Sequence, residues 1–435
     1  MRTTMLKWTL LFVVFSLALL LPASGGTAQA ATGCVNPGGT GGCFASIQVA
    51  INAAAPGDVI TIAPGTYREN VTVTKPVTLA GAGVYSIVQP AVSNPNPCPG
   101  SSLCGGTASN IMLVQADNVT IHDLTLDGDN PLLTSGIVRG GADLDARNGI
   151  ITNHPLGRFD NLTIYNVTVK NVYLRGIYAS SGGSFNFHDN TVQNVQGDYY
   201  SIGMFNFGGA GAFVNNQVSY ANDAISANWS RGTQFLNNRV ANSGSGVHTD
   251  NSGTAGFADV IRGNTVWNCM AGGYGVFVFV PYMAPVVDGN SILRCSVGLA
   301  AFGSAQPLTT AFTNNTVNGA NLAGSTGVYA TDDQLGYGCG NTSALFTGNT
   351  VQNNTTGFDL EQTTCSLSVA LSQNNIKGNG TGVYNNTTTA VNASGNWWGC
   401  PQGPGAPGCD TIVNARTGST IVSPNLKRPI QSTTP

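Results

Sequence analysis

The sequence of 435 residues carries a formal net charge of −3, and Asp, Glu, Lys and Arg together make up only 9% of it. Soluble domains usually contain about 25% of these residues, and nucleic-acid-binding domains add a basic surface. No nucleic-acid partner is therefore expected. With 57 glycines and many Asn, Thr and Val residues, the composition favours short strands and turns over helices.

Residues 1–30 have the pattern of a secretory signal peptide. Arg2 and Lys7 precede an apolar run at residues 8–21, and Ala28-Gln29-Ala30 resembles a cleavage site with small residues on both sides. The apolar run of 14 residues is shorter than the about 20 that a membrane-spanning helix needs. We expect a secreted protein, extracellular or periplasmic, without a membrane span.

The segment 31–43 is expected to be closed by a disulfide, and a capping helix is expected to follow it. In residues 44–55 apolar side chains recur at helical spacing, and residues 56–58 (Pro-Gly-Asp) end the pattern. Residues 59–81 then have the pattern of short strands separated by Gly and Pro. A helix here would cover the open end of a stack of strands, whose edges are otherwise unpaired.

Residues 128–160 interrupt the short strands with a long, charged segment. Long loops on a rigid scaffold often carry function, whereas a salt-bridged loop without chemistry is the alternative. The charged residues of this segment are Asp129, Arg139, Asp143, Asp145, Arg147, His154 and Arg158. The run at residues 127–130 (Asp-Gly-Asp-Asn) fits either a plain turn or a Ca²⁺-binding loop. No other cofactor and no other metal is expected.

Asparagines recur along the rest of the chain at intervals of 22 to 34 residues. A fixed period of 20–50 residues is the signature of a repeat architecture, in which each unit buries its apolar face against its neighbours. Each unit contains three short extended pieces, with the asparagine at a tight turn where its amide can form a ladder with the next. The asparagines are Asn166, Asn190, Asn216, Asn238, Asn264, Asn290, Asn315, Asn349 and Asn375, followed by Asn396.

The same period predicts disulfide pairs among the ten cysteines. Cys269 and Cys295 each lie five residues after a repeat asparagine, and Cys339 and Cys365 each lie ten residues before one. Residues in the same phase of adjacent coils are about 4.8 Å apart, inside the Cα window of about 4.4–6.8 Å for a disulfide. We predict Cys269–Cys295 and Cys339–Cys365, and local pairs for the remainder: Cys34–Cys43, Cys98–Cys104 and Cys400–Cys409.

Two stretches carry a family resemblance. The segment FASIQVAINAAAPGDVITIAPGTYRENVTVTKPVTLAGAG near the N-terminus and SGNWWGCPQGPG at residues 394–405 resemble the start and end of secreted proteins of the right-handed parallel β-helix superfamily typified by pectate lyases. The resemblance implies an all-β parallel β-helix of about 11–12 coils over residues 44–405, with a C-terminal tail at 406–435. It leaves function open, because the superfamily contains lyases, hydrolases, epimerases and non-enzymatic surface proteins.

The period also predicts which side chains share the outer face of one row of strands. We align the strands on one inward apolar residue in each coil, beginning with Ile137, Ile177 and Ile202. Because side chains alternate along a strand, the next residue in each coil is expected to point outward. The outward column is then expected to contain Val138, Tyr178, Gly203, Ser226, His248, Phe277, Ala300, Tyr329, Asp359 and Tyr384. Two residues further on lie Ser180, Phe205, Asn228, Asp250, Phe279, Phe302, Thr331, Glu361 and Asn386. Ser226 should therefore lie beside His248, and Asn228 beside Asp250.

This face contains the candidate site, and the resemblance implies a substrate cleft on the same strands. The catalytic candidates are His248, Asp250, Asp223 and Tyr178, and the substrate-binding candidates are Arg175, Asp198, Tyr199, Tyr200, Asn228, Trp229, Arg231 and Phe277. β-Elimination of a uronate needs a base and a group on the carboxylate. Hydrolysis needs two carboxyl groups roughly 5–9 Å apart, and neighbouring coils are expected to bring Asp223 and Asp250 near that separation. A surface histidine, an aspartate that only shapes its turn and a loop-covered aromatic patch are the structural alternatives.

Three functions are compatible with the sequence, which leaves open whether the protein is an enzyme. The first is a carbohydrate-active or polysaccharide-binding protein, resembling a polysaccharide lyase or alternatively a glycoside hydrolase. The second is a non-catalytic, adhesin-like surface protein, and the third is a periplasmic maturation factor for a copper enzyme. The sequence lacks an adjacent Asp-Asp pair with the Gly-His-Gly and Arg-x-Lys companions of polygalacturonases, and it lacks the Arg-x-x-x-Arg pattern of pectate lyases. We expect a monomer with a polysaccharide as its partner.

Overall fold

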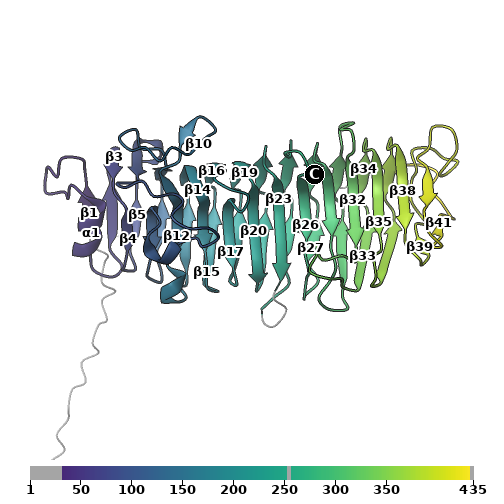
Figure 1. Ribbon diagram of the computed structural model, residues 1–435, viewed down its shortest axis with the longest axis horizontal. Helices are drawn as coiled ribbons and strands as arrows, with labels where there is room; N and C mark the ends of the chain where they lie inside the picture. The colour runs from purple at the N-terminus through teal and green to yellow at the C-terminus, as the bar shows by residue number, and fades with distance from the viewer. Residues whose placement is uncertain (1–31, 252–255, 432–435) are drawn as a thin grey trace, which may run out of the picture. The chain divides into compact units, whose positions relative to one another are not determined.

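The computed structural model describes residues 32–251 and 256–431. The predicted signal peptide lies outside these residues. The described unit is a stack of short parallel strands arranged along one axis, as Figure 1 shows. In this part of the chain, no helix has both the length and the apolar composition needed to cross a bilayer.

Fifteen strands form the first sheet. In spatial order they are β1 (Thr32–Val35), β2 (Val59–Ile62), β5 (Thr78–Ala80), β8 (Thr120–His122), β13 (Leu162–Tyr165), β15 (Ser184–His188), β18 (Ala210–Val214), β21 (Thr233–Leu236), β24 (Val260–Arg262), β27 (Val286–Asp288), β30 (Thr309–Thr313), β33 (Thr342–Thr347), β36 (Leu367–Ser372), β39 (Val391–Asn392) and β41 (Thr420–Ile421).

The other large sheet consists of two rows that share the long strand β14 (Thr168–Ala179). The second row is β3 (Gly65–Arg68), β6 (Ser86–Gln89), β9 (Thr125–Asp127), β14, β16 (Thr191–Val195), β19 (Gln217–Ala221), β22 (Arg239–Ala241), β25 (Thr265–Trp267), β28 (Ser291–Leu293), β31 (Thr316–Asn318), β34 (Thr350–Gln352) and β37 (Asn375–Lys377). The third row is β4 (Val71–Val73), β7 (Asn110–Val114), β12 (Ala146–Thr152), β14, β17 (Ile202–Phe207), β20 (Asp223–Ser230), β23 (Ser245–Asn251), β26 (Tyr274–Val278), β29 (Val297–Ala301), β32 (Thr326–Thr331), β35 (Thr356–Glu361), β38 (Thr381–Asn386) and β40 (Ile412–Asn414).

The parallel β-helix predicted from the sequence is therefore present, but it is longer than expected. The first sheet has fifteen strands, whereas the sequence predicted about 11–12 coils. The count fell short because it relied on the asparagine period, which the first coils lack. Some strands of the stack lie outside residues 44–405. β1, before residue 44, pairs with β2, and β40 and β41, after residue 405, pair with β38 and β39.

The N-terminal end of the stack is covered by the predicted helix, α1 (Ile47–Ala53). Ile47, Ala50 and Ile51 face the core, in agreement with the helical spacing of apolar residues. Glu69 accepts hydrogen bonds from the backbone N–H groups of Ile47 and Gln48, which have no partner within the helix. The short 3₁₀ helices are η1 (Gly83–Tyr85), η2 (Cys104–Gly106) and η3 (His154–Leu156).

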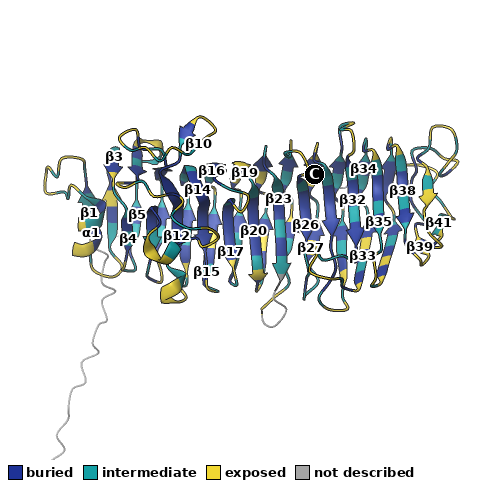
Figure 2. Ribbon diagram, viewed as in Figure 1, coloured by how far each residue is buried: buried dark blue, intermediate teal, exposed yellow. Residues whose placement is uncertain are grey.

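Inside the stack, apolar side chains fill the core and one row of asparagines joins successive coils. Figure 2 shows the alternation of buried and accessible positions along the strands. Each asparagine amide donates to the side-chain oxygen of the next at 2.9–3.0 Å, through Asn190, Asn216, Asn238, Asn264, Asn290, Asn315, Asn349, Asn374 and Asn396. Two expected members, Asn166 and Asn375, are absent from this row. Asn190 Oδ1 accepts from the backbone N–H of Val167 instead of from Asn166, and Asn374 takes the place of Asn375.

All five predicted disulfides are present. Cys269–Cys295 and Cys339–Cys365 join adjacent coils, with Cα atoms 4.6 and 5.8 Å apart. Cys34–Cys43, Cys98–Cys104 and Cys400–Cys409 close local loops. The pairing follows directly from the period, since residues one coil apart in sequence are neighbours in space.

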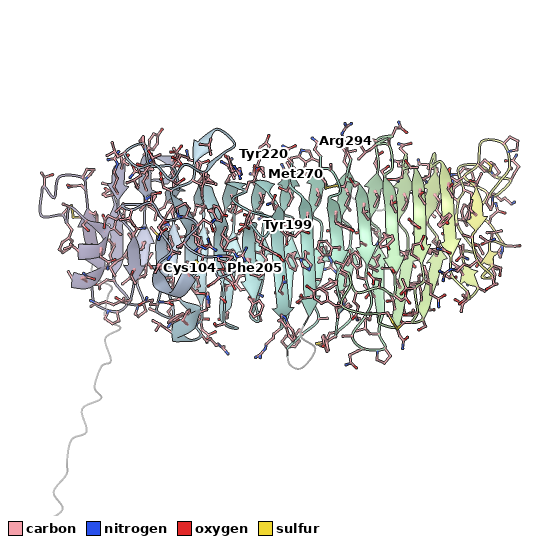
Figure 3. All side chains as sticks on the ribbon, viewed as in Figure 1. Cys104, Tyr199, Phe205, Tyr220, Met270 and Arg294 are labelled. Carbon is pink, nitrogen blue, oxygen red and sulfur yellow. A yellow bond between two sulfur atoms is a disulfide. The ribbon has the colours of Figure 1, made fainter. Side chains whose placement is uncertain are left out.

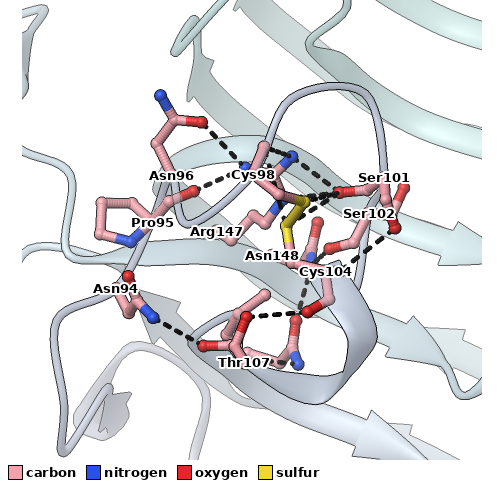
Figure 4. The surroundings of a disulfide bond; sticks show 12 residues. Asn94, Pro95, Asn96, Cys98, Ser101, Ser102, Cys104, Thr107, Arg147 and Asn148 are labelled. Atoms are coloured by element: carbon pink, nitrogen blue, oxygen red, sulfur yellow. Dashed lines mark hydrogen bonds between the residues drawn. A yellow bond between two sulfur atoms is a disulfide. The ribbon is translucent and has the colours of Figure 1, made fainter.

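The charged segment 128–160 is mostly part of the scaffold. It forms a hairpin of β10 (Val138–Arg139) and β11 (Ala142–Asp143), and then the fully buried strand β12. Arg147 has no exposed surface and donates to the backbone carbonyls of Pro95, Cys98 and Ser101. Figure 4 shows its guanidinium beneath the loop closed by Cys98–Cys104. These bonds fix that loop, which accounts for the burial of an arginine without a carboxylate partner.

Candidate functional site

The outward side chains of the third row form columns along the axis. In register with one another are Asn148, Arg175, Ile202, Asp223, Ser245, Tyr274, Val297, Thr326, Thr356 and Thr381. The next column contains Ile151, Tyr178, Phe205, Ser226, His248, Phe277, Ala300, Tyr329, Asp359 and Tyr384. The predicted neighbours Ser226 and His248 are confirmed as register partners.

The predicted columns were wrong at the N-terminal end. The inward partner of Ile177 is Met204, not Ile202, and Ile150 takes the place assigned to Ile137. Consequently Phe205 replaces Gly203 and Ile151 replaces Val138 in the outward column. Ile202 is the first apolar residue after its loop, but it lies two positions before the core position, in register with the polar Arg175 and Asp223. Val138 lies in the β10–β11 hairpin.

A cleft with a volume of about 600 Å³ lies on this face. Eight of the twelve catalytic and substrate-binding residues predicted from the sequence line it: Arg175, Tyr199, Tyr200, Asp223, Asn228, His248, Asp250 and Phe277. Figure 3 labels Tyr199, Phe205 and Met270, which are also lining residues. Residues separated by more than 100 positions therefore meet in one site because the coils stack.

His248 is the centre of the polar contacts in the cleft. Its Nδ1 lies 3.1 Å from Ser226 Oγ and 3.4 Å from Asp223 Oδ2, and its side chain is 12% exposed. Ser226 donates its hydroxyl proton to Asn228 Oδ1 at 2.8 Å, so its oxygen is free to accept from Nδ1–H. Both contacts favour the proton on Nδ1 and leave Nε2 as the basic nitrogen. Nε2 is buried and has no hydrogen-bond partner in the described part of the chain.

Asp250 lies next to His248 at the far end of the same strand. Burial raises the pKa of Asp250 to about 6, although His248 and the backbone N–H of Trp229, which donates to Oδ1, both oppose this shift. A carboxyl group with this pKa can hold a proton near neutral pH and donate it to an oxygen atom.

The two cleft carboxylates are further apart along the strand than the sequence predicted. Asp223 is in register with Ser245, so Asp250 lies five residues beyond it on the neighbouring strand. At about 3.3 Å per residue, this separates their main-chain positions by roughly 16 Å along the strand. His248 lies between them along the strand. The register therefore does not place the two carboxyl groups on opposite sides of a single glycosidic bond.

Arg175 and Tyr178 have structural contacts that the sequence did not indicate. Arg175 is 8% exposed and donates Nη1–H to the backbone carbonyl of Tyr200. Its guanidinium lies over the rings of Phe205 at 5.1 Å and Tyr178 at 5.8 Å, and burial lowers its pKa to about 10. Tyr178 packs among apolar residues beneath the 98–104 loop and accepts a hydrogen bond from Ser180, and it does not line the cleft. Its assignment as a catalytic base therefore has no geometric support.

Three other candidates lie around the cleft. Asp198 lines a smaller neighbouring hollow together with Tyr173 and the loop at 96–100, and it shares Tyr199 and Tyr200 with the main cleft. Trp229 is 54% exposed, with a positive φ of 54°. It contributes its backbone N–H to Asp250 rather than its ring to the lining. Arg231 is exposed and also absent from the lining.

Aromatic residues form the other wall of the cleft. Phe277 stacks on the His248 ring with 4.0 Å between centroids and 16° between planes. Tyr274 and Tyr337 were missed by the sequence analysis, whereas Phe279 and Phe302 were correctly placed on the outer face. Tyr274 could have been found from the column of Asp223, but Tyr337 comes from an insertion whose path no period predicts. This insertion is held by the Cys339–Cys365 disulfide.

A second pair of carboxyl groups lies on the same face, towards the C-terminal end. Asp359 is in register with Tyr329 and Tyr384, and Glu361 accepts a hydrogen bond from Asn386 at 2.6 Å. Burial, and then the charge of Glu361, raise the pKa of Asp359 to about 7. The face as a whole is therefore acidic.

Metal-ligating side chains cluster at one point in the described ranges, at Asp332, Cys339 and Cys365. Both cysteines are in a disulfide, and Asp332 accepts hydrogen bonds from the backbone N–H groups of Thr363 and Cys365. At residues 127–130, Asp127 is paired with Lys170 at 2.9 Å, and Ca²⁺ binding by this loop stays a prediction.

Comparison with known proteins agrees with this architecture. A family described as "Right handed beta helix region" matches residues 108–317. The described unit is a right-handed parallel β-helix. No curated protein matches the sequence.

Solved structures with the same β-helix fold differ widely in sequence. The A-module of mannuronan C-5 epimerase AlgE6 from Azotobacter vinelandii is 18% identical, with a TM-score of 0.53 over 88% of this chain and 95% of that one. The catalytic unit of the GH87 alpha-1,3-glucanase from Streptomyces thermodiastaticus is 16% identical, with a TM-score of 0.56 over 93% and 71% of the two chains. At these identities the likeness shows the fold alone.

Proposed function

We propose that this β-helix protein is exported and binds a polysaccharide in the cleft of the third row, where it carries out acid–base chemistry on the bound chain. One observation carries the proposal: aromatic faces and titratable side chains line the same cleft. Phe277, Tyr274 and Phe279 stand beside His248, Asp223 and Asp250.

Sugar rings suit such a lining for a physical reason. Each ring has an apolar face of C–H groups that can stack on aromatic side chains, and hydroxyl groups around its edge that need fixed hydrogen-bond partners. Tyr199 and Tyr200, which are 85% and 66% exposed at the rim, extend the aromatic surface. Ser226 and Asn228 present polar atoms beside it.

The comparisons support a carbohydrate ligand in general terms. The neighbours with this fold are named as a mannuronan epimerase and an alpha-1,3-glucanase, and both names refer to polysaccharides. The five disulfides fit an oxidising compartment outside the cytoplasm. The signal-like residues 1–30 agree with export.

The proposed chemistry assigns different roles to His248 and Asp250. The contacts of Nδ1 with Ser226 and Asp223 leave Nε2 as a base. Asp250, with its raised pKa, is the acid that donates a proton to the departing oxygen. Phe277 fixes the plane of the imidazole from one side.

A non-catalytic glycan-binding surface is the second candidate function. It is favoured by the burial of His248 Nε2 and by the separation of Asp223 and Asp250 along the strands. In that case the polar side chains only bind hydroxyl groups.

The test combines binding and turnover on one panel of soluble polysaccharides. We expect at least one polysaccharide to bind and be cleaved by the wild type, with turnover reduced at least about 100-fold in His248→Ala and Asp250→Asn. Asp189→Asn, on the opposite sheet beside His188, is the matched control and should be unchanged. Binding without turnover in every protein would favour the second candidate, and the absence of any binding would refute both.

A further inference from the structure

The charges on the third row bear on the class of sugar that fits the cleft. From β12 to β38, the outward columns described above contain one cationic residue, Arg175, apart from His248. The same two columns contain two acidic residues, Asp223 and Asp359, and two more, Asp250 and Glu361, lie two positions further along their strands. Charge of one sign in a cleft with apolar walls raises the local potential and repels ions of that sign.

The positive charge of Arg175 is not accessible to the carboxylate of a ligand. Its Nη1–H is donated to the backbone carbonyls of Leu174 and Tyr200, and its guanidinium is covered by Phe205 and Tyr178. Its Nε is buried and has no hydrogen-bond partner in the described part of the chain, and the side chain is only 8% exposed. A bidentate clamp on a carboxylate needs an accessible guanidinium edge. Moreover, the sequence has no lysine between Lys170 and Lys377 that could supply a second cation.

On the basis of the proposed function, we infer that the cleft selects glycans without anionic groups, neutral polysaccharides in particular, and excludes polyuronates. A polyuronate brings one carboxylate per sugar, and in the cleft these carboxylates would lie near Asp223 without an accessible cation beside them. A neutral chain instead stacks its C–H faces on the exposed rings of Tyr199, Tyr200 and Tyr337, which also line the cleft. Elimination, which requires a uronate carboxylate to be neutralised, is then disfavoured relative to chemistry on a neutral glycosidic bond.

The experiment measures affinity for size-matched neutral and anionic oligosaccharides by calorimetry. Neutral gluco-, manno- and xylo-oligosaccharides are compared with oligogalacturonate and oligomannuronate at two NaCl concentrations. Raising NaCl from about 20 mM to about 300 mM shortens the electrostatic screening length from roughly 20 Å to roughly 6 Å. We expect a neutral ligand to bind at least about tenfold more tightly than either uronate at low salt. Salt should leave neutral binding unchanged and should strengthen any residual uronate binding.

A charge variant on the face separates electrostatics from shape. Asp359→Asn/Glu361→Gln removes two acidic groups outside the cleft lining, and we expect it to raise uronate affinity about fivefold. Asp123→Asn/Asp189→Asn removes two acidic groups on the opposite sheet and should have no effect. Arg175→Gln should not weaken uronate binding.

The outcomes also separate this inference from the proposed function. Tighter binding of a uronate than of every neutral sugar, weakened by salt and lost in Arg175→Gln, would overturn the inference and leave the proposed function standing. Failure of every sugar, neutral and anionic, to bind would overturn both. Preference for a neutral sugar in the wild type, with the expected response in the face variant, supports the inference.

Discussion

The ring of His248 lies flat against the ring of Phe277, one coil further along the stack, with 4.0 Å between their centroids. The two residues are register partners on β23 and β26, so the stacking follows from the period of the helix. It places an aromatic plane behind the only histidine in the cleft lining, while Asp223 and Ser226 contact the ring edge. The aromatic wall and the polar centre of the cleft are therefore in direct contact.

Replacing Phe277 should disturb both parts. In Phe277→Leu the imidazole loses its stacking partner and the sugar loses an aromatic face, and we expect affinity for the best oligosaccharide to fall about tenfold, equivalent to about 1.4 kcal/mol. Calorimetric titration measures this change. Phe346→Leu, at a fully buried core position, is the control for a general loss of stability. An equal loss of affinity in Phe346→Leu would show that the effect is not local.

The raised pKa of Asp250 predicts a dependence of stability on pH. Because the folded-state pKa of about 6 lies above the ordinary value of 3.8, the folded protein binds the proton more tightly than the unfolded chain. The resulting stability is fully present below about pH 4 and is lost as the pH rises through 6. We therefore compare the free energy of unfolding of Asp250→Asn with that of the wild type. The variant's advantage should be about 2–3 kcal/mol larger at pH 7.5 than at pH 4.

Urea unfolding of Asp250→Asn and wild type across this pH range measures the difference. Asp189→Asn, which alters an exposed carboxylate, is the control. A stability difference that stays constant between pH 4 and pH 7.5 would contradict the burial of an ionisable Asp250.

The row of asparagines should be a sensitive point of the scaffold. Asn264 is completely buried, accepts from the backbone and side-chain N–H groups of Asn238, and donates to Asn290 and the carbonyl of Phe235. Asn264→Ala leaves several of these groups unpaired, so we expect a loss of about 3 kcal/mol in the free energy of unfolding. Asn52→Ala, at an exposed position of α1, should change it by less than about 0.5 kcal/mol. Similar effects at both positions would argue against the importance of the row.

Arg147 should control the order of the loop closed by Cys98–Cys104. Arg147→Met removes the donors to Pro95, Cys98 and Ser101, and the freed carbonyls should draw the loop towards solvent. We expect hydrogen exchange in residues 95–104 to accelerate at least about tenfold, with little change in β20 and β23. Arg158→Met, at an exposed arginine paired with Asp160, is the control and should leave this loop unchanged.

The sequence by itself determined the stack and much of its cross-linking. The interval between repeated asparagines equals one coil, so it specified which strands are neighbours and paired Cys269 with Cys295 and Cys339 with Cys365. It also placed Ser226 beside His248. These relationships are one-dimensional, because in a solenoid a fixed number of residues corresponds to a fixed step along the axis.

Only the tertiary structure decided what the face can do. Ile202 and Met204 show the limit of the period, since the length of an irregular loop shifted the register by two residues. Nη1–H of Arg175 is donated to the carbonyl of Tyr200, and Tyr337 reaches the cleft from an insertion. The pKa of Asp250 depends on how much surrounding atoms shield it from water. Burial and loop paths depend on packing in three dimensions, which a repeat interval does not encode.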